Sequence, residues 1–221
     1  IEGSGLDLLE LPCAAVPEAV VERLRSFDEI ISWYGTSRPE FAEALLRIGI
    51  KVVFHPALPG QGASVHAVDF YLTQVGATAG GVPALPIERR GGGYAVIHPY
   101  SGSARKNWPI ERFRAVEVRL AGEMEVKWCA GPEENLEGAE RFDTVGELAR
   151  FLAGARAYLG NDSGPSHLAA AVGTPVVAMF GPTDPSVWAP RGERVDVLSF
   201  LASVDEVAEM VLRAGSRRRS G

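Results

Sequence analysis

The chain has 221 residues, 46% hydrophobic and 23% charged, which is the composition of an ordinary globular protein and excludes a disordered one. Its 22 basic and 28 acidic residues give a net charge of −6, which argues against a general affinity for nucleic acid. The 2 cysteines and 4 histidines have no disulfide-framework or metal-ligand spacing, so we expect neither a disulfide scaffold nor a metal site.

The first 90 residues alternate between helical and strand patterns. In one segment Phe41, Ala44, Leu45 and Ile48 recur on a single helical face. We expect helices over 17–27, 39–48 and 65–75, and strands over 29–34 and 51–54. Little before the first of these strands could begin a sheet, so we expect the N-terminal domain to be incomplete in this chain.

The remaining residues continue the alternation after a Gly- and Pro-rich stretch, with the best linker at 89–93. We therefore predict two domains, 1–90 and 91–221. In the second we expect strands over 94–98, 125–130, 155–159 and 176–180, and helices over 109–121, 144–153, 165–172 and 204–214. Strand and helix in turn are typical of a parallel, doubly wound α/β sheet.

The turn at 160–164 is the most informative local feature. It joins an apolar strand to a helix that begins near Pro165 and ends at Gly173. The next strand, Val176–Phe180, is apolar throughout, as a strand covered on both faces must be. The turn thus places a helix N-terminus at the carboxyl edge of a parallel sheet, where α/β proteins hold anions such as diphosphates.

Two other interpretations of this turn compete with an anion site. A hydrolase nucleophile elbow needs G-x-S-x-G, but Ser163 stands one residue out of register and no suitable acid and base follow it. Alternatively, Asp162 and Ser163 only cap the helix and His167 is a partly buried helix residue. We expect capping in either case, but capping alone does not explain polar groups converging on one dipole end.

A second polar loop, residues 101–106, follows the strand at 94–98 and so reaches the same kind of edge. Ser101 and Ser103 offer hydroxyls, and Lys106 offers a compact cation for phosphate oxygens, with Arg105 as an alternative. Glu133 and Glu134 follow the next strand as ribose-binding carboxylates often do, although acidic residues in a first helical turn are equally common.

Both loops carry sequence blocks that resemble the heptosyltransferases, glycosyltransferase family 9. The first block is D-S-G-P-x-H-L-A-A-A-x-G-T-P, which begins at Asp162, followed by F-G-P-T-D-P at 180–185. The second is H-P-x-S-G-S with K-x-W-P, over 98–109. The likeness runs from roughly residue 95 to residue 190 and is thin before it.

The resemblance implies a GT-B fold of two Rossmann-like domains and an inverting, metal-independent transfer of a heptose from ADP-heptose to a lipopolysaccharide core. It implies that Glu134 (or Glu133) contacts the ribose and that Asp143 lies where the base is seated. The implied diphosphate and sugar contacts are Ser101, Ser103, Lys106, Asp162, Ser163, Gly164 and His167.

The catalytic base is harder to locate. In this family it is an aspartate in a G-D context after the first strand. Asp7 is a candidate, but Leu6 separates it from Gly5 and no strand precedes it. We therefore expect the base to lie upstream of Ile1.

The resemblance also implies the partners: a nucleotide-sugar donor, a lipopolysaccharide-type glycan acceptor and no cofactor. No apolar run is near the roughly 20 residues of a membrane span, so we expect a cytoplasmic protein. We also expect a monomer that contacts the inner face of the membrane. The main alternative is a nucleotide- or sugar-phosphate-binding module that lacks the base. A dinucleotide dehydrogenase is disfavoured because no G-x-G-x-x-G opens a helix, and the glycines at 91–93 precede a strand.

Overall fold

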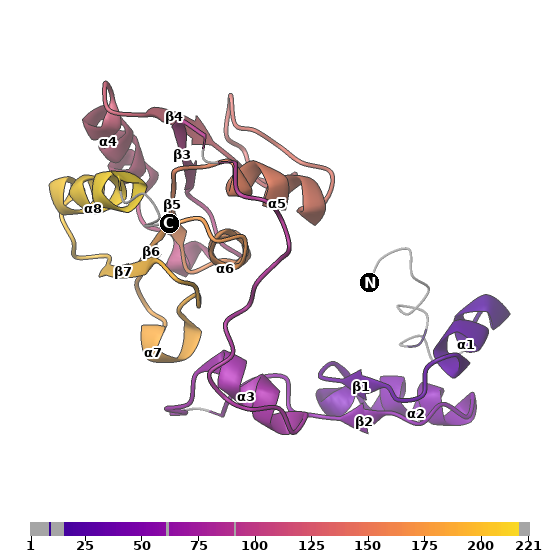
Figure 1. Ribbon diagram of the computed structural model, residues 1–221. Coiled ribbons are helices and arrows are strands. Elements are labelled where there is room, and N and C mark those ends of the chain that lie inside the picture. The colour runs from indigo at the N-terminus through magenta and orange to yellow at the C-terminus, as the bar shows by residue number, and fades with distance from the viewer. Residues whose placement is uncertain (1–8, 10–15, 61, 91, 217–221) are drawn as a thin grey trace. The chain divides into compact units, whose positions relative to one another are not determined.

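The computed structural model describes residues 9, 16–60, 62–90 and 92–216. Asp7, the candidate base, lies outside the described residues. The chain forms two compact units, residues 1–63 with 70–77 and residues 64–69 with 78–221. Figure 1 labels the elements in chain order.

The first unit holds a short parallel β-pair and its helices. The strands β1 (Ile31–Ser32) and β2 (Val53–Phe54) pair in parallel, with Ile31 opposite Val53. Both are shorter than the predicted strands. After β1 the chain soon turns into a 3₁₀ helix, η2 (Gly35–Ser37). The helices are α1 (Glu18–Arg25), α2 (Pro39–Arg47) and α3 (Ala67–Gln74), whose first residues belong to the second unit.

The apolar face predicted for the second helix is the core of this unit. Phe41, Ala44 and Leu45 of α2 are buried with Leu9 and Ile50. The helical spacing of these side chains is what places them on one face of α2, and this prediction is confirmed.

The second unit is built on a five-stranded parallel sheet in the order β4-β3-β5-β6-β7. Its strands are β3 (Tyr94–His98), β4 (Glu125–Trp128), β5 (Ala157–Asn161), β6 (Val176–Phe180) and β7 (Val195–Ser199). Every residue of β5 and β6 is buried, as expected for strands covered on both faces. The edge strand β7 was not predicted from the sequence.

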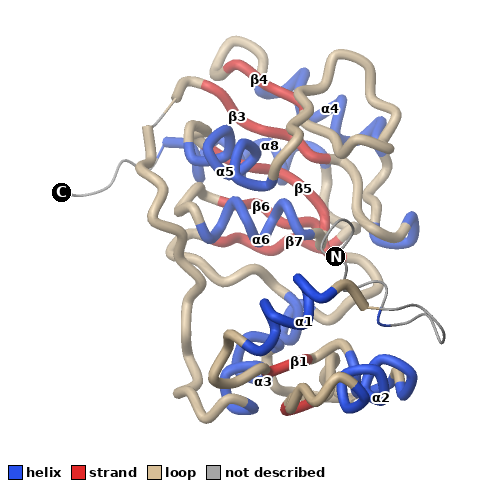
Figure 2. Tube along the Cα trace, turned by 90° about the vertical axis from the view of Figure 1, so that its right-hand side faces the viewer, coloured by secondary structure: helices blue, strands red, loops and turns tan. Residues whose placement is uncertain are grey.

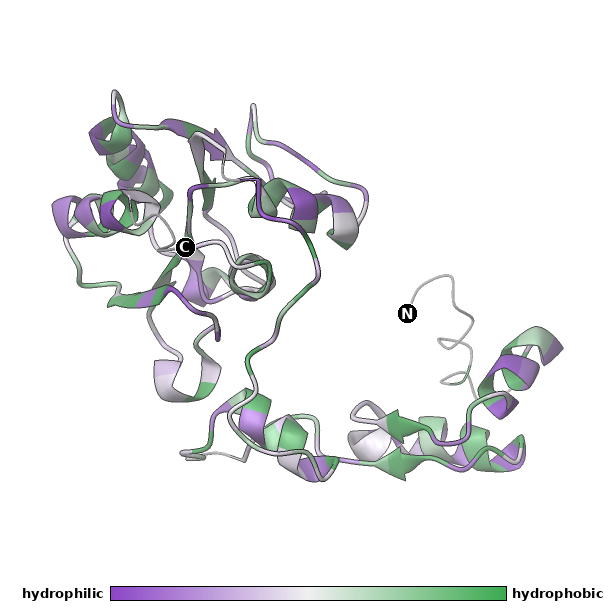
Figure 3. Cartoon of the chain, in the orientation of Figure 1, coloured by the Kyte–Doolittle hydropathy of each residue, from purple (hydrophilic) through white to green (hydrophobic). Residues whose placement is uncertain are grey.

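Helices cover both faces of this sheet. The pair α4 (Ile110–Leu120) and α8 (Val204–Ser216) packs on one face, and α5 (Val145–Ala153) and α6 (Gly164–Ala171) on the other (Figure 2). Figure 3 shows that α4 and α8 each carry a hydrophobic and a hydrophilic side. The short elements η3 (Ala104–Lys106) and α7 (Pro185–Trp188) lie in loops.

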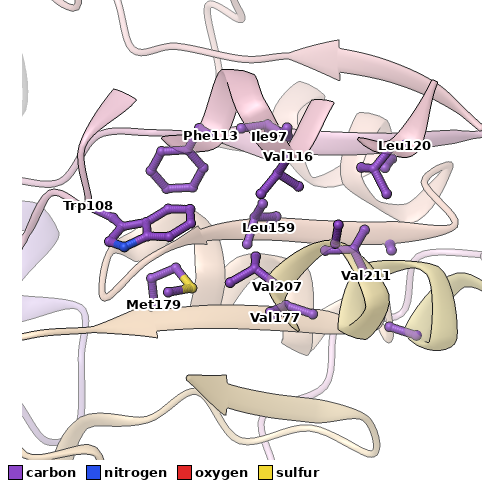
Figure 4. Packing of buried hydrophobic residues seen from close by; sticks show 14 of the residues in the cluster. Ile97, Trp108, Phe113, Val116, Leu120, Leu159, Val177, Met179, Val207 and Val211 are labelled. Carbon is purple, nitrogen blue, oxygen red and sulfur yellow. The ribbon is translucent and has the colours of Figure 1, made fainter. Parts of the chain in front are cut away.

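The core beneath α4 and α8 fixes these helices to the sheet. Trp108, Phe113 and Leu120 are at most 1% exposed and pack with strand residues such as Leu159 and Met179 (Figure 4). Burial of one such side chain contributes roughly 1.5–3 kcal/mol. The start of α4 is therefore held firmly behind the loop that precedes it.

The strand order creates a switch point between β3 and β5. From β3 the chain continues to β4 on one side, whereas from β5 it continues to β6 and β7 on the other. The two loops that leave the carboxyl ends of β3 and β5 run to opposite faces, and such a switch point is where open α/β sheets bind ligands. Among the described residues, no helix is both long and apolar enough to span a membrane.

Candidate functional site

Asn161, the last residue of β5, ties the two loops of the switch point together. Its side chain is fully buried, its Nδ2 donates to the Pro99 carbonyl at 2.7 Å, and its Oδ1 accepts from the Trp108 N–H at 2.9 Å. Ser166 of α6 donates from Oγ to the Asn161 carbonyl at 2.5 Å. The β3 loop and the start of α6 are thus fixed to the same strand end.

Lys106 and Asp162 meet where these two loops come together. The Lys106 Nζ donates to the Asp162 Oδ2 at 3.2 Å, and Thr183 Oγ1 donates to the same oxygen at 2.8 Å. The Lys106 side chain is 28% exposed and that of Asp162 only 9%, so solvent screens the pair less than a surface ion pair. Loops from β3, β5 and β6 therefore converge on one carboxylate oxygen.

His167, in the first turns of α6, stands beside this ion pair. Its side chain is exposed, yet its pKa is lowered, mainly by desolvation, with His66 and Lys106 adding to the effect and Asp162 opposing it. The ring is neutral at pH 7 and would gain a proton most readily beside an incoming anion.

The start of α6 is not capped by the side chains that the sequence suggested. Ser163 holds the N-cap position without a capping hydrogen bond, and its Oγ lies 3.4 Å from that of Ser166. The Asp162 carboxylate is paired with Lys106 instead, so the expectation that both residues cap the helix was wrong. The first N–H groups of a helix have no intrahelical partner and stay available to a ligand.

Both glycines of the two loops face open space. A Cβ atom built on Gly102 or on Gly164 would meet nothing within 4 Å, and neither residue has a positive φ. Protein packing therefore does not require glycine at these positions. The backbone at both positions is therefore open to close approach.

The two serines of the β3 loop differ, because Ser101 is hydrogen-bonded within the loop and Ser103 is exposed. Ser101 Oγ lies 2.8 Å from the Ser103 carbonyl and 2.7 Å from Asn107 Oδ1, so it shapes the loop. Ser103 and Arg105 are exposed, whereas Lys106 is partly buried against Asp162.

Glu134 is placed by contacts that Glu133 lacks. The His98 Nε2 lies 3.2 Å from the Glu134 Oε2, and the Gly131 N–H donates to that oxygen at 2.6 Å. Glu133 is exposed. The buried His98 ring belongs to the end of β3, so Glu134 is joined to the same edge as the Lys106 loop.

Asp143 is exposed and precedes Thr144, which forms a capping box with Glu147 at the start of α5. In the part of the chain that the structure describes, no hydrogen bond or ion pair connects Asp143 with another predicted site residue. No group of three or more His, Cys, Asp or Glu that could hold a metal occurs in the same described ranges.

Sequence reasoning overlooked three residues of this site: His98, Asn161 and Thr183. His98 and Asn161 are polar side chains that end buried apolar strands, and a polar residue at the carboxyl end of a parallel strand was an available signal. Thr183 follows β6 and lies in the block F-G-P-T-D-P at 180–185, which entered the sequence analysis only as part of the family resemblance.

A family model decides what this constellation belongs to. Residues 73–209 match the model of glycosyltransferase family 9 (heptosyltransferase), more than half of the chain. The chain belongs to glycosyltransferase family 9. The resemblance inferred from the two sequence blocks is confirmed.

Curated relatives agree with this assignment. The chain is 32% identical to lipopolysaccharide heptosyltransferase 3 of Escherichia coli, over 45% of this chain and 34% of the relative. It is 35% identical to lipopolysaccharide heptosyltransferase 1 of Salmonella typhimurium, over 42% of this chain and 34% of the relative. The chain thus spans about a third of the length of the curated relatives it matches.

Solved family 9 structures share the fold. E. coli heptosyltransferase WaaC with ADP superposes with a TM-score of 0.61 at 22% identity, covering 89% of this chain and 74% of that one. The family 9 glycosyl transferase from Veillonella parvula superposes with a TM-score of 0.67 at 17% identity, covering 89% and 77%. At these identities the likeness shows the fold alone, and the predicted α/β, GT-B fold class is confirmed.

Proposed function

We propose that this chain carries the donor-binding site of an inverting, metal-independent glycosyltransferase. The donor is a nucleotide-diphosphate sugar, ADP-heptose, and the acceptor is a hydroxyl of a lipopolysaccharide core or similar glycan. The single observation that carries the proposal is the convergence of Lys106, Asp162 and the start of α6 at the β3–β5 switch point of a family 9 chain.

The charges at this point suit a departing diphosphate. Lys106 supplies a cation, His167 can accept a proton, and the N-terminus of α6 adds the positive end of a helix dipole. Such groups stabilise negative charge that develops on a leaving group. We propose the remaining contacts from the same geometry, with Ser101 shaping the loop, and Ser103, Ser163 and Gly164 lining the phosphate path.

The proposed transfer needs one further group, a general base. The base takes the proton of the acceptor hydroxyl, and the oxygen attacks the anomeric carbon from the face opposite the diphosphate. The bond from that carbon to the diphosphate oxygen then breaks, and ADP leaves with the electron pair. The base is the aspartate that the family resemblance implies. Asp7 is the candidate in this chain and lies outside the described residues.

We propose fewer contacts for the adenosine end of the donor. Glu134 contacts the ribose and Asp143 lies toward the base. We further propose that the protein works as a monomer in the cytoplasm, at the inner face of the membrane that holds its acceptor.

The alternative is a binding module that holds a nucleotide or sugar phosphate without transferring it. It is favoured if the site binds ADP but no base is in place. Incubation of the protein with ADP-heptose and a lipopolysaccharide core acceptor separates the two. Transfer would release ADP and give a glycoside of the opposite anomeric configuration by NMR, whereas a module would bind the donor and leave it intact.

Titration calorimetry tests the site itself. The account expects ADP to bind with a dissociation constant between about one micromolar and one millimolar, a free energy of about −8 to −4 kcal/mol. NAD serves as the control ligand, because it contains the same adenosine diphosphate with the terminal phosphate esterified to a second ribose, which carries nicotinamide. Binding of NAD without binding of ADP would overturn the proposal.

A further inference from the structure

His98 is an unusual residue to find at the end of a buried strand. It is the last residue of β3, and its side chain is only 6% exposed. Burying a polar ring without a hydrogen bond is costly, so such a ring is normally paired. Its partner here is Glu134, whose Oε2 lies 3.2 Å from His98 Nε2.

The contact with His98 uses one oxygen of the Glu134 carboxylate and leaves the other oxygen open. Oε2 takes both the His98 contact and the 2.6 Å hydrogen bond from the Gly131 N–H. Oε1 has no hydrogen bond to any residue that the structure describes, and the Glu134 side chain is 25% exposed. The carboxylate is therefore anchored at one oxygen and open at the other.

The loop that carries Glu134 is itself tied down. Arg141 donates from one guanidinium nitrogen to the Glu134 carbonyl at 2.6 Å and to the Leu136 carbonyl at 3.2 Å. Tyr100, which follows β3, donates from its hydroxyl to the Asn135 carbonyl at 3.1 Å. The backbone of this loop is held beside the β3 edge, and the His98 contact fixes the direction of the side chain.

The protonation of His98 agrees with a donor role. Burial lowers its pKa, against the opposing effect of Glu134, so the ring is neutral at pH 7. A neutral ring carries one N–H, and we assign it to Nε2, because that atom faces the Glu134 carboxylate. The bond is that of a neutral donor to a charged acceptor, a strong class.

We propose that His98 is a positioning residue that holds the Glu134 carboxylate so that its open oxygen accepts a hydrogen bond from a ribose hydroxyl of the donor nucleotide. His98 thereby sets the preference of the site for a ribonucleotide over a deoxyribonucleotide without touching the ligand. The inference rests on the proposed donor site. A fixed acceptor discriminates well against a ligand that lacks the hydroxyl, because the partly buried carboxylate then loses a partner.

The test compares the dissociation constants of ADP, 2′-deoxy-ADP and 3′-deoxy-ADP by calorimetry. The wild-type protein should prefer ADP to one of the deoxy analogues by about tenfold or more, the size of one hydrogen bond to a carboxylate. Glu134→Gln and His98→Leu should both reduce this preference to about twofold. His98→Gln, which keeps a donor within reach, should retain most of it.

Lys106→Met is the matched control. It should weaken all three ligands by the same factor and leave the preference unchanged, because a diphosphate contact does not sense the ribose. If the wild-type protein binds no ADP, the proposed donor site fails. If it binds ADP but His98→Leu keeps the wild-type preference, the positioning role of His98 fails while the donor site stands.

Thermal melting accompanies each titration. The proposal expects His98→Leu to lose the preference while it keeps a cooperative transition. Should that variant not fold, His98→Asn is measured in its place, since its shorter side chain cannot reach Glu134 Oε2. A folded Asn variant with full preference would equally overturn the inference.

Discussion

Lys106 and Asp162 are 56 positions apart in the sequence, and the Nζ of one lies 3.2 Å from the Oδ2 of the other. The pair satisfies a partly buried cation in the absence of ligand. A diphosphate bound between these loops would compete with Asp162 for the same ammonium group. Thr183 donates to the same Asp162 oxygen at 2.8 Å, so the carboxylate keeps a partner when Lys106 turns to the ligand.

The first prediction concerns the cation of this pair. Lys106→Met should weaken ADP binding by roughly 1–3 kcal/mol, the loss of one charge-assisted contact. Arg105→Met is the control, since Arg105 is the neighbouring cation and is exposed. Calorimetry on both variants would contradict the assignment if Arg105→Met, and not Lys106→Met, lost affinity.

A second prediction concerns the buried amide that joins the two loops. Asn161→Ala removes two hydrogen bonds and leaves the Trp108 N–H and the Pro99 carbonyl buried without a partner. The free energy of unfolding should fall by about 3 kcal/mol, as measured by denaturant titration.

Ser103→Ala is the comparison for this variant. Ser103 is exposed, so the substitution should change the free energy of unfolding by less than about 0.5 kcal/mol. Equal stability of Asn161→Ala and the wild-type protein would show that the loops are held together by other contacts.

The pH dependence of stability gives a third prediction. Burial lowers the pKa of His98 in the folded protein below its usual value of 6.5. The unfolded chain therefore binds more protons than the folded one below that pH. Stability should be full above about pH 6.5 and fall as the pH drops through the folded pKa of His98.

Denaturant titrations between about pH 8 and about pH 5 measure this decline. His98→Gln removes the titrating ring and should flatten the curve. His167, whose pKa is also lowered, contributes in the same direction, so part of the slope should survive in the variant. An unchanged slope in His98→Gln would contradict the direction given for His98.

A fourth prediction concerns His167 and the ligand. The ring is neutral at pH 7 because desolvation lowers its pKa. A bound diphosphate favours the protonated ring, so binding should take up a proton, and ADP affinity should rise as the pH falls from about 8 to about 6.

ADP itself titrates in this range, so the wild-type curve alone is not diagnostic. The difference between the wild-type protein and His167→Gln cancels the titration of the ligand. The wild-type curve should be steeper, and calorimetry in buffers of different ionisation enthalpy should show the extra proton uptake. Parallel curves would separate His167 from the diphosphate.

Elements with strong periodicity were predicted well from the sequence. The helix expected over 109–121 is α4 at Ile110–Leu120, and the apolar strand at Val176–Phe180 has the same bounds in the structure. The strand β7 was missed because its residues, all half-buried or exposed at the sheet edge, form neither a continuous apolar run nor a regular alternation. The four residues of α7 are too few for a helical period to show.

The pairings within the site were harder to predict than its residues. Lys106, Asp162 and His167 were each singled out by spacing and motif. That Asp162 would hold Lys106, and not cap α6, depends on how the β3 and β5 loops meet across the switch point. The His98–Glu134 contact likewise joins two loops through the sheet order, which no local pattern encodes.

The most direct test of the central claim, a diphosphate site between the β3 and β5 loops, is the affinity of ADP relative to AMP. We predict that the wild-type protein binds ADP at least about tenfold more tightly than AMP, because the second phosphate meets Lys106 and the start of α6. The double variant Lys106→Met, His167→Gln should abolish this preference. Its loss of ADP affinity should be smaller than the sum of the losses in the two single variants. Equal affinity for ADP and AMP in the wild-type protein, or no binding of ADP, would contradict the account.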